Sequence, residues 1–197
     1  MLIARDTGRR EQAMPEDTGR HPLPPGSAWG EIDTPIGTLA LVVTQRGLLR
    51  LNFGPLRRIK RDFEPAQAPS ELADHPVGVR VVRQLAEYFA GERQEFDIDV
   101  DWSLTAGAQR VILETLHAKV SYGSTVGYGD LALMSGRTLA ASRLVGTVMG
   151  SNPVAIVVPC HRVIAADGGL GGFGGGLETK RRLLTLEGSL QPTLFDV

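Results

Sequence analysis

The hydrophobic pattern opens with two short stretches whose residues are typical of β-strands. They are TLALVVT at residues 38–44 and LLRLNF at residues 48–53, and both are rich in β-branched or large apolar side chains. Gly37 and Gly47 precede them, where a chain reversal needs a permissive residue. The pattern predicts a β-hairpin or meander whose first strand begins near Trp29.

The next segments differ in period and composition. Residues 77–90 place apolar side chains at helical spacing and are followed by Gly91, which predicts a helix that ends there. EFDIDVDW, residues 95–102, alternates as a strand does. Residues 55–76 are rich in Pro, Arg and Glu and predict irregular structure. Residues 1–27 are polar and aperiodic, which predicts disorder.

From Gly107 onward the pattern becomes helical. Helices are expected at residues 107–118, 128–134, 139–149 and 178–187. In the first, Val111, Ile112, Thr115 and Leu116 are expected to face inward. The second and third are short and joined by a tight turn at residues 135–138, which predicts a helix-turn-helix.

These elements predict an α+β protein with two domains. The N-terminal domain, residues 28–102, combines a helix with a small antiparallel sheet. The C-terminal domain, residues 103–188, is mainly helical, and tails at 1–27 and 189–197 flank the two.

Charge and targeting signals narrow the function classes. The formal net charge is −1, which alone argues against a nucleic-acid protein. The distribution is uneven, since residues 103–188 carry 8 Lys and Arg against 5 Asp and Glu. No apolar run is long enough to cross a bilayer, and the N-terminus lacks the apolar core of a secretory signal. We expect a cytoplasmic protein without membrane contact.

The single cysteine, Cys160, ends an apolar run in NPVAIVVPCHRVI, residues 152–164. One cysteine excludes an internal disulfide and a cysteine-rich zinc site. VAIVV predicts a buried strand or extended segment that aims Cys160. Because successive side chains of an extended chain point apart, contact between Cys160 and His161 would need a turn or a bridging water. An imidazole that takes the thiol proton, steadied by a carboxylate such as Glu187, would make Cys160 nucleophilic. For an isolated Cys-His pair, a buried structural cysteine is the commoner case.

The sequence around Cys160 and His161 favours a reactive cysteine over a structural one. PCHRVI follows Asn152-Pro153 and precedes a loop with seven glycines among residues 168–176, centred on Phe173. Together these motifs resemble the O6-alkylguanine-DNA alkyltransferases, nearly continuously over residues 128–188, and the hairpin TPIGTLAL resembles the start of that family's N-terminal domain. The resemblance implies an RNase H-like N-terminal domain and a winged-helix-like C-terminal domain. It also implies a monomer that repairs double-stranded DNA carrying O6-alkylguanine, with action on O4-alkylthymine as well, and with no cofactor or metal.

The resemblance assigns roles to individual residues. Cys160 would accept the alkyl group, His161 would act on it through a water, and Glu187 would polarise His161. Asn152 would fix the turn between the helix-turn-helix and the active site. Four further positions would meet the flipped guanine or its DNA, and a fifth would sit beside them in the loop. Tyr128 would help to rotate the nucleotide and would bond the flipped guanine, and Arg143 would fill the gap left in the base stack. The backbone carbonyls of Cys160 and Val163 would accept hydrogen bonds from the guanine amino group. The Gly174 N–H would donate to O6, and Gly175 is the next residue of the loop.

The sequence also departs from the family pattern. Leu144, Thr147 and Val148 make the expected recognition helix bulkier than usual, which would change how it enters the minor groove. Ala155 stands where the family often has proline, and Gly174 stands where it often has serine. Lys180 and Arg162, by contrast, are expected to be surface charges without a catalytic role.

Two other functions fit part of the sequence. Alkyltransferase-like proteins bind alkylguanine without repairing it and recruit other machinery, but they typically lack the acceptor cysteine that is present here. A cysteine hydrolase could use Cys160 and His161, yet this hypothesis shows no clear oxyanion arrangement and leaves the helix-turn-helix unexplained.

Overall fold

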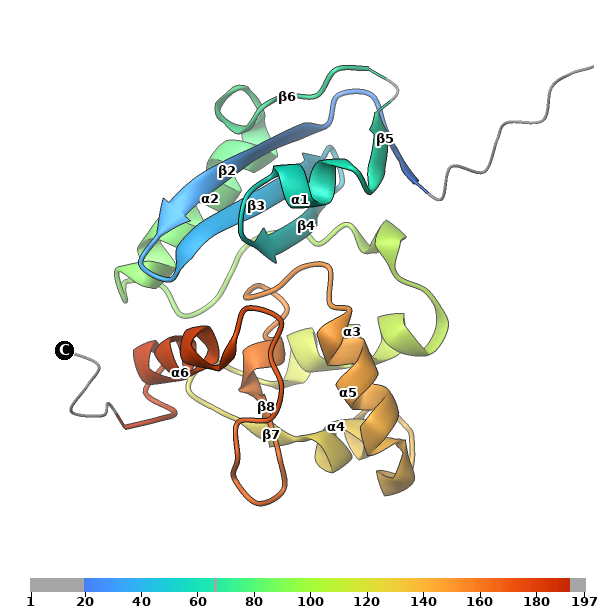
Figure 1. Cartoon of the computed structure of the whole chain (residues 1–197), viewed down its shortest axis with the longest axis vertical. Helices are drawn as coiled ribbons and strands as arrows, with labels where there is room; N and C mark the ends of the chain where they lie inside the picture. The colour runs from blue at the N-terminus through green and yellow to red at the C-terminus, as the bar shows by residue number, and fades with distance from the viewer. Residues whose placement is uncertain (1–19, 66, 192–197) are drawn as a thin grey trace, which may run out of the picture.

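The computed structural model describes residues 20–65 and 67–191. Figure 1 shows a sheet with its helices above a group of helices formed by the C-terminal half of the chain. The mixed helix and strand content confirms the expected α+β class. The part of the 1–27 tail that falls on residues 1–19 lies outside the described residues.

The central sheet of the N-terminal domain has four strands in the order β4-β3-β2-β6. Its strands are β2 (Ala28–Thr34), β3 (Gly37–Thr44), β4 (Gly47–Phe53) and β6 (Ser70–Glu71). β2, β3 and β4 form the expected antiparallel meander, and β6 adds a short parallel edge to β2. Residues 39–44 of β3 are all buried, because this strand is central and both of its faces are covered.

The two faces of the sheet pack against different partners. On one face, Leu39, Leu41 and Val43 join the main core with α2 (Pro76–Phe89). On the other face, Ala40 and Val42 join a second core.

The second core corrects two predictions. The layer that covers this face of the sheet comes from β1 (His21–Leu23), α1 (Arg57–Lys60) and β5 (Phe63–Pro65). β1 pairs in parallel with β5, and Leu23 is buried in the second core. The predictions of disorder at 21–23 and of irregular structure throughout 55–76 are therefore wrong. Each segment contributes one or two apolar side chains, too few to produce a periodic signal.

Residues 95–102 do not form the predicted strand. The segment is extended but makes only an isolated bridge between Val100 and Leu48, with the 3₁₀-helix η2 (Trp102–Leu104) after it. The sequence alternates because Ile98 turns into the core while its charged neighbours face water. The alternation therefore reflects burial of one face in a segment that bridges to β4 at Leu48 but does not form a strand.

The C-terminal domain contains the expected helices with small shifts in their ends. Its elements are α3 (Gly107–Lys119), β7 (Val126–Gly127), α4 (Tyr128–Met134), η3 (Leu139–Ala141), α5 (Ser142–Gly150), η4 (Cys160–Arg162), β8 (Val163–Ile164) and α6 (Leu177–Leu186). α4 and α5 form the helix-turn-helix, although its second helix starts with a 3₁₀ turn. Val111 is 44% exposed, so the prediction that it faces inward is wrong, and Leu113 is buried instead.

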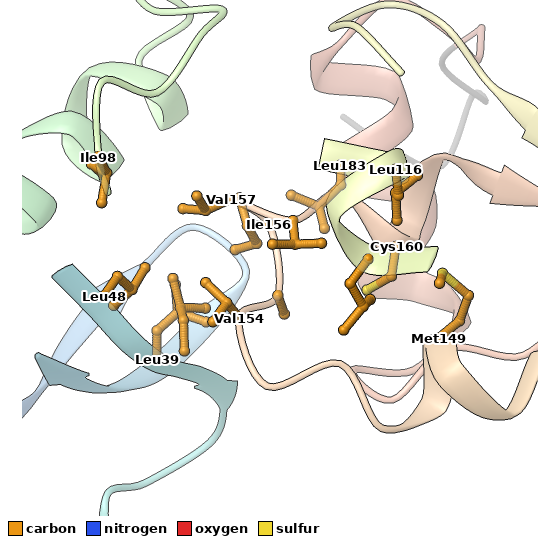
Figure 2. Close-up of a cluster of buried hydrophobic side chains, with 14 of the residues drawn as sticks. Leu39, Leu48, Ile98, Leu116, Met149, Val154, Ile156, Val157, Cys160 and Leu183 are labelled. Atoms are coloured by element: carbon orange, nitrogen blue, oxygen red, sulfur yellow. The ribbon is translucent and has the colours of Figure 1, made fainter. Parts of the chain in front are cut away.

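One hydrophobic core runs through both domains. Figure 2 shows Leu39 and Leu48 of the sheet at one end of a buried cluster and Cys160 with Met149 at the other. Backbone hydrogen bonds also cross the junction, from Leu51 N to Pro153 O (2.8 Å) and from Ala155 N to Leu51 O (3.1 Å). The edge strand β4 therefore holds the segment that leads to Cys160.

Two negative findings apply to residues 20–65 and 67–191. No helix there has the length and apolar character needed to cross a membrane. No group of three or more His, Cys, Asp or Glu side chains there could hold a metal ion.

Candidate active site

The chain reaches Cys160 through a buried turn. Val158 N donates to Val154 O (2.9 Å), and Val157 N donates to Ala155 O (2.9 Å). Ile156, at the centre, has φ 71°, a left-handed conformation that a β-branched residue rarely adopts. The expected strand or extended segment is thus a tight turn, because the segment folds back under β4. Strain of this kind persists only where the surrounding packing enforces it.

Cys160 begins η4 and is 6% exposed. It lines a cavity of about 90 Å³ together with Asn152, Ala155 and Gly174. Burial raises the pKa of the Cys160 thiol, whereas the Asn152 side chain, the Lys180 ammonium and nearby backbone N–H groups oppose that rise. The thiol is therefore neutral at rest and needs a base before it can attack.

Glu187, just after α6, is the centre of a buried hydrogen-bond network. Its Oε1 accepts from Tyr88 Oη (2.7 Å) and from Arg162 Nη2 (2.9 Å), and Oε2 accepts from Arg162 Nε (2.8 Å). Oε1 also lies 2.9 Å from His161 Nε2. Burial alone would raise the pKa of Glu187, but the hydrogen bonds from His161 and Arg162 outweigh it and lower that pKa to about 2. Glu187 is therefore a carboxylate at neutral pH.

This carboxylate determines which ring nitrogen of His161 carries the proton. An ionised carboxylate can only accept hydrogen bonds, so His161 Nε2 must carry the proton that it donates to Glu187. The second ring nitrogen, Nδ1, then holds a lone pair. Nδ1 is buried and has no hydrogen-bond partner among the described residues. Burial lowers the pKa of His161, so the ring is neutral and Nδ1 is free to accept a proton.

Asn152 lies between α5 and the buried turn that leads to Cys160. Its Nδ2 donates to Val158 O (2.8 Å), and its Oδ1 accepts from Val154 N (3.0 Å). The side chain thus closes both ends of the Val154–Val158 turn two residues after α5. This placement is compatible with the turn-fixing role that the resemblance implies.

Arg162 and Lys180 are not surface charges, as the sequence suggested. Arg162 is 6% exposed, and its Nη1 donates to Val120 O (2.6 Å) in addition to binding Glu187. Lys180 is fully buried, and its Nζ donates to Val163 O (2.6 Å) and to Leu170 O. Burial lowers the pKa of Lys180 to about 8. Lys180 thus supplies the Val163 carbonyl with a buried side-chain donor.

The helical period could have revealed Lys180. It lies three and four residues before the buried Leu183 and Leu184, and seven before Glu187, so all four share one face of α6. A lysine that shares a face with buried leucines is unusual unless its ammonium finds acceptors. Tyr88, by contrast, carries no signal that ties it to Glu187, because that contact spans the two domains. Arg162 carries none either, since it lies 25 residues before Glu187 in the chain.

A second hollow lies on the outer face of the helix-turn-helix. The groove has a volume of about 580 Å³ and is lined by Tyr128, Arg143, small residues of α4 and α5, and part of the glycine loop. A Cβ placed on Gly171 would lie 2.9 Å from Tyr128 Oη, so the loop backbone passes directly over the hydroxyl. Arg143 is exposed, and its side chain borders this groove.

Helix α5, the expected recognition helix, differs from expectation in one respect. Leu144 is 41% exposed and Thr147 is exposed, so both add bulk beside Arg143. Val148 is only 4% exposed and packs in the core. Val148 therefore cannot alter the outer face, and the prediction that it would do so is wrong.

The glycine loop connects the groove with the cavity. Gly171 and Gly172 line the groove, while Phe173 and Gly174 line the cavity beside Cys160. Gly175 packs against Phe53 of β4. Phe53 and its neighbour Asn52 also line the cavity, a contact that sequence reasoning missed because they lie in the other domain.

Family models match both halves of the chain. A model described as "6-O-methylguanine DNA methyltransferase, ribonuclease-like domain" matches residues 28–102. A second, described as "6-O-methylguanine DNA methyltransferase, DNA binding domain", matches residues 108–189. Together they cover more than half of the chain.

Relatives and solved structures agree with these models. A methylated-DNA–protein-cysteine methyltransferase of Mycobacterium bovis is 44% identical over 168 residues, which cover 84% of this chain and 96% of the relative. The crystal structure of Mycobacterium tuberculosis O6-methylguanine methyltransferase is similar with a TM-score of 0.69 and 38% identity, over 84% of this chain and 95% of that one. The crystal structure of M. tuberculosis OGT in complex with DNA has a TM-score of 0.69 and 37% identity, over 82% and 93%.

Proposed function

Because the chain belongs to the O6-methylguanine DNA methyltransferase family, we propose that it takes the alkyl group of O6-alkylguanine in double-stranded DNA onto Cys160, once per molecule. The chain is accordingly a DNA repair methyltransferase of this family, and O4-alkylthymine is a further substrate under the proposal. The observation that carries the proposal is the buried Glu187–His161 pair, with an unpartnered His161 Nδ1, next in sequence to a thiol that lines a cavity.

The activation step follows from the site's protonation states. The Cys160 thiol is neutral because burial raises its pKa, and His161 Nδ1 has the lone pair that can take the thiol proton through a water. Glu187 stabilises the imidazolium that forms, and Arg162 keeps Glu187 ionised in the buried network. General-base help of this kind typically contributes about 10²–10⁴-fold in rate.

The transfer step exchanges one bond for another. The Sγ–carbon bond forms while the carbon–O6 bond breaks, and the electron pair of the broken bond stays on the guanine. The Gly174 N–H and the Tyr128 hydroxyl would stabilise the negative charge that develops there. The proton that left Cys160 is balanced by the proton that restores neutral guanine. The thioether has no base-assisted route back, so each protein acts once.

The base must leave the duplex to reach Cys160. The buried thiol is out of reach of a stacked base, and flipping costs a few kcal/mol. Under the proposal, the groove beside Tyr128 receives the nucleotide, and Arg143, which borders the groove, fills the vacated stack. We further propose that the protein acts as a monomer and without a cofactor, since every group used in these steps belongs to this one chain.

Intact-protein mass spectrometry tests the proposal directly. The protein is mixed with excess duplex DNA carrying one O6-methylguanine, and Cys160→Ser serves as the control. We expect the mass to increase by one methyl group and to stop there, with no increase in the control. An unchanged mass with retained binding to the lesion in a gel-shift assay would favour a lesion-binding protein instead. An unchanged mass without binding would overturn the assignment.

A further inference from the structure

The cavity beside Cys160 has a wall that comes from the N-terminal domain. Asn52 and Phe53, at the end of β4, line it together with Met149, Ala155, Phe173 and Gly174 of the C-terminal domain. The wall is held in place, because Leu51 exchanges backbone hydrogen bonds with Pro153 and Ala155. The N-terminal domain therefore contributes side chains to the space in which the thiol reacts.

Phe53 is in close contact with the glycine loop. Its ring meets the ring of Phe173 edge-on, with 5.3 Å between the centroids and 62° between the planes. A Cβ placed on Gly175 would lie 2.9 Å from the Phe53 ring, closer than real Cβ atoms approach. The loop backbone thus rests directly on the ring, and Phe53 fixes both the width of the cavity and the position of the loop.

The two hollows differ in size in a way that separates their roles. The groove beside Tyr128 and Arg143 has a volume of about 580 Å³, and the cavity beside Cys160 has about 90 Å³. The groove is the hollow with room for a flipped base, whereas the group bonded to O6 must lie close to the thiol. The cavity is then the space into which an alkyl group larger than methyl extends.

We propose that Phe53 is a specificity-determining residue, whose ring limits the size of the alkyl group that can reach Cys160. The inference rests on the proposed alkyl transfer. It follows from the position of the ring between the cavity and Gly175: a large alkyl group has to displace a side chain that is held by Phe173, Gly175 and the backbone of β4. A methyl group needs no such displacement.

A competition experiment measures this selectivity in the full-length protein. Limiting protein is mixed with equal amounts of two duplexes, one carrying O6-methylguanine and the other O6-benzylguanine, and intact mass spectrometry counts methylated and benzylated protein. The product ratio does not depend on the fraction of active protein, so a partial loss of folding leaves it unchanged. We expect the benzyl-to-methyl ratio to rise at least about 10-fold in Phe53→Ala, more weakly in Phe53→Leu, and to fall in Phe53→Trp.

The matched control is Trp29→Ala. Trp29 is also a partly buried aromatic residue of the sheet, but it packs on the second core, away from the cavity. Its truncation should leave the product ratio at the wild-type value. The same ratio in wild type and all three Phe53 variants would overturn the inference while the proposed function stands. No adduct of either kind in the wild type would overturn the proposed function, and the inference with it.

Discussion

Among the residues that the structure describes, Glu187 accepts four hydrogen bonds, and two of them come from the fully charged Arg162. Glu187→Gln removes the carboxylate and leaves the Arg162 guanidinium buried without a counter-charge. Breaking a buried ion pair in this way costs about 3–5 kcal/mol in the free energy of unfolding. The variant also loses the anion that stabilises the His161 imidazolium, so the rate of alkyl transfer should fall by about 10²-fold or more. Denaturant unfolding and quench-flow transfer assays measure the two effects.

Glu178→Gln is the matched control for this prediction. Glu178 lies on the same helix, is 64% exposed and pairs with Arg182 at i,i+4. An exposed pair contributes about 0–1 kcal/mol, so this variant should retain nearly full stability and rate. Equal losses in both variants would show that α6 responds to any lost carboxylate, and the buried network would not be the cause.

The same network predicts sensitivity to acid. Burial lowers the pKa of His161 below its ordinary 6.5 in the folded state. For Glu187, hydrogen bonds from His161 and Arg162 outweigh burial and lower the pKa from 4.5 to about 2. In both cases the unfolded chain binds protons first as pH falls, so protonation favours unfolding. The free energy of unfolding should decrease below about pH 6.5, and decrease further between pH 4.5 and 2.

Urea unfolding at a series of pH values checks this prediction. His161→Asn should lose the part of the decrease that lies between pH 7 and pH 5. His21→Asn, which changes an exposed histidine in β1, should retain it. A wild-type unfolding free energy that is flat from pH 7 to pH 4 would contradict the assignment of a neutral buried His161.

At the scale of elements, Lys180 ties three segments together. From α6 it donates to the Val163 carbonyl of β8 and to the Leu170 carbonyl in the glycine loop. Lys180→Met leaves two carbonyls without that donor, at about 1–3 kcal/mol for each one that stays buried. We expect faster hydrogen exchange in residues 168–176 and slower alkyl transfer. Arg181→Met, which removes the same charge one residue away, should leave loop exchange unchanged, and equal exchange in both variants would contradict the anchoring role.

The elements also show how far periodicity can predict this fold. The β2–β4 meander was predictable because short apolar runs rich in strand-forming residues are separated by glycines near the turns. Helices α2, α3 and α4 were predictable because each buries one continuous face, which gives the sequence a period of 3.6. β1 and β5 were not predictable, since each pairs only with the other across some forty residues. Residues 95–102 show the opposite error, where alternation arose from burial of one face in a segment that bridges to β4 at Leu48 without forming a strand.

The residues of the candidate site also fall into those that the sequence could predict and those that it could not. Cys160, His161 and Glu187 could be nominated because their residue types carry chemistry and their motif is specific, and the structure brings His161 and Glu187 into contact. The turn that carries Cys160 could not be predicted, because a run of valines and isoleucine with φ 71° at its centre has no local signal for a turn. Phe53 was missed because only the docking of the two domains gives it a place beside the thiol.

At the scale of the whole molecule, the two domains share one core. The main cluster contains Leu41 and Leu51 of the sheet together with Val154, Cys160 and Leu183 of the C-terminal domain. Tyr88 of α2 reaches the active-site carboxylate, and Leu51 is bonded to the turn before Cys160. Separating the domains would expose apolar surface and leave these polar groups unpaired. Unfolding of one domain should therefore destabilise the other.

Val42→Ala tests this coupling from a distance. Val42 is fully buried in the second core, on the face of the sheet turned away from Cys160. Removing two methylene equivalents there costs about 2 kcal/mol. If the domains unfold as one unit, hydrogen exchange in denaturant should show the same lowered midpoint for peptides of β3 and of α6. Alkyl transfer under native conditions should stay at the wild-type rate, because no contact of the active site has changed. A lowered midpoint in β3 alone would mean that the domains unfold independently, and that the wall formed by β4 can come away from Cys160 while the C-terminal domain stays folded.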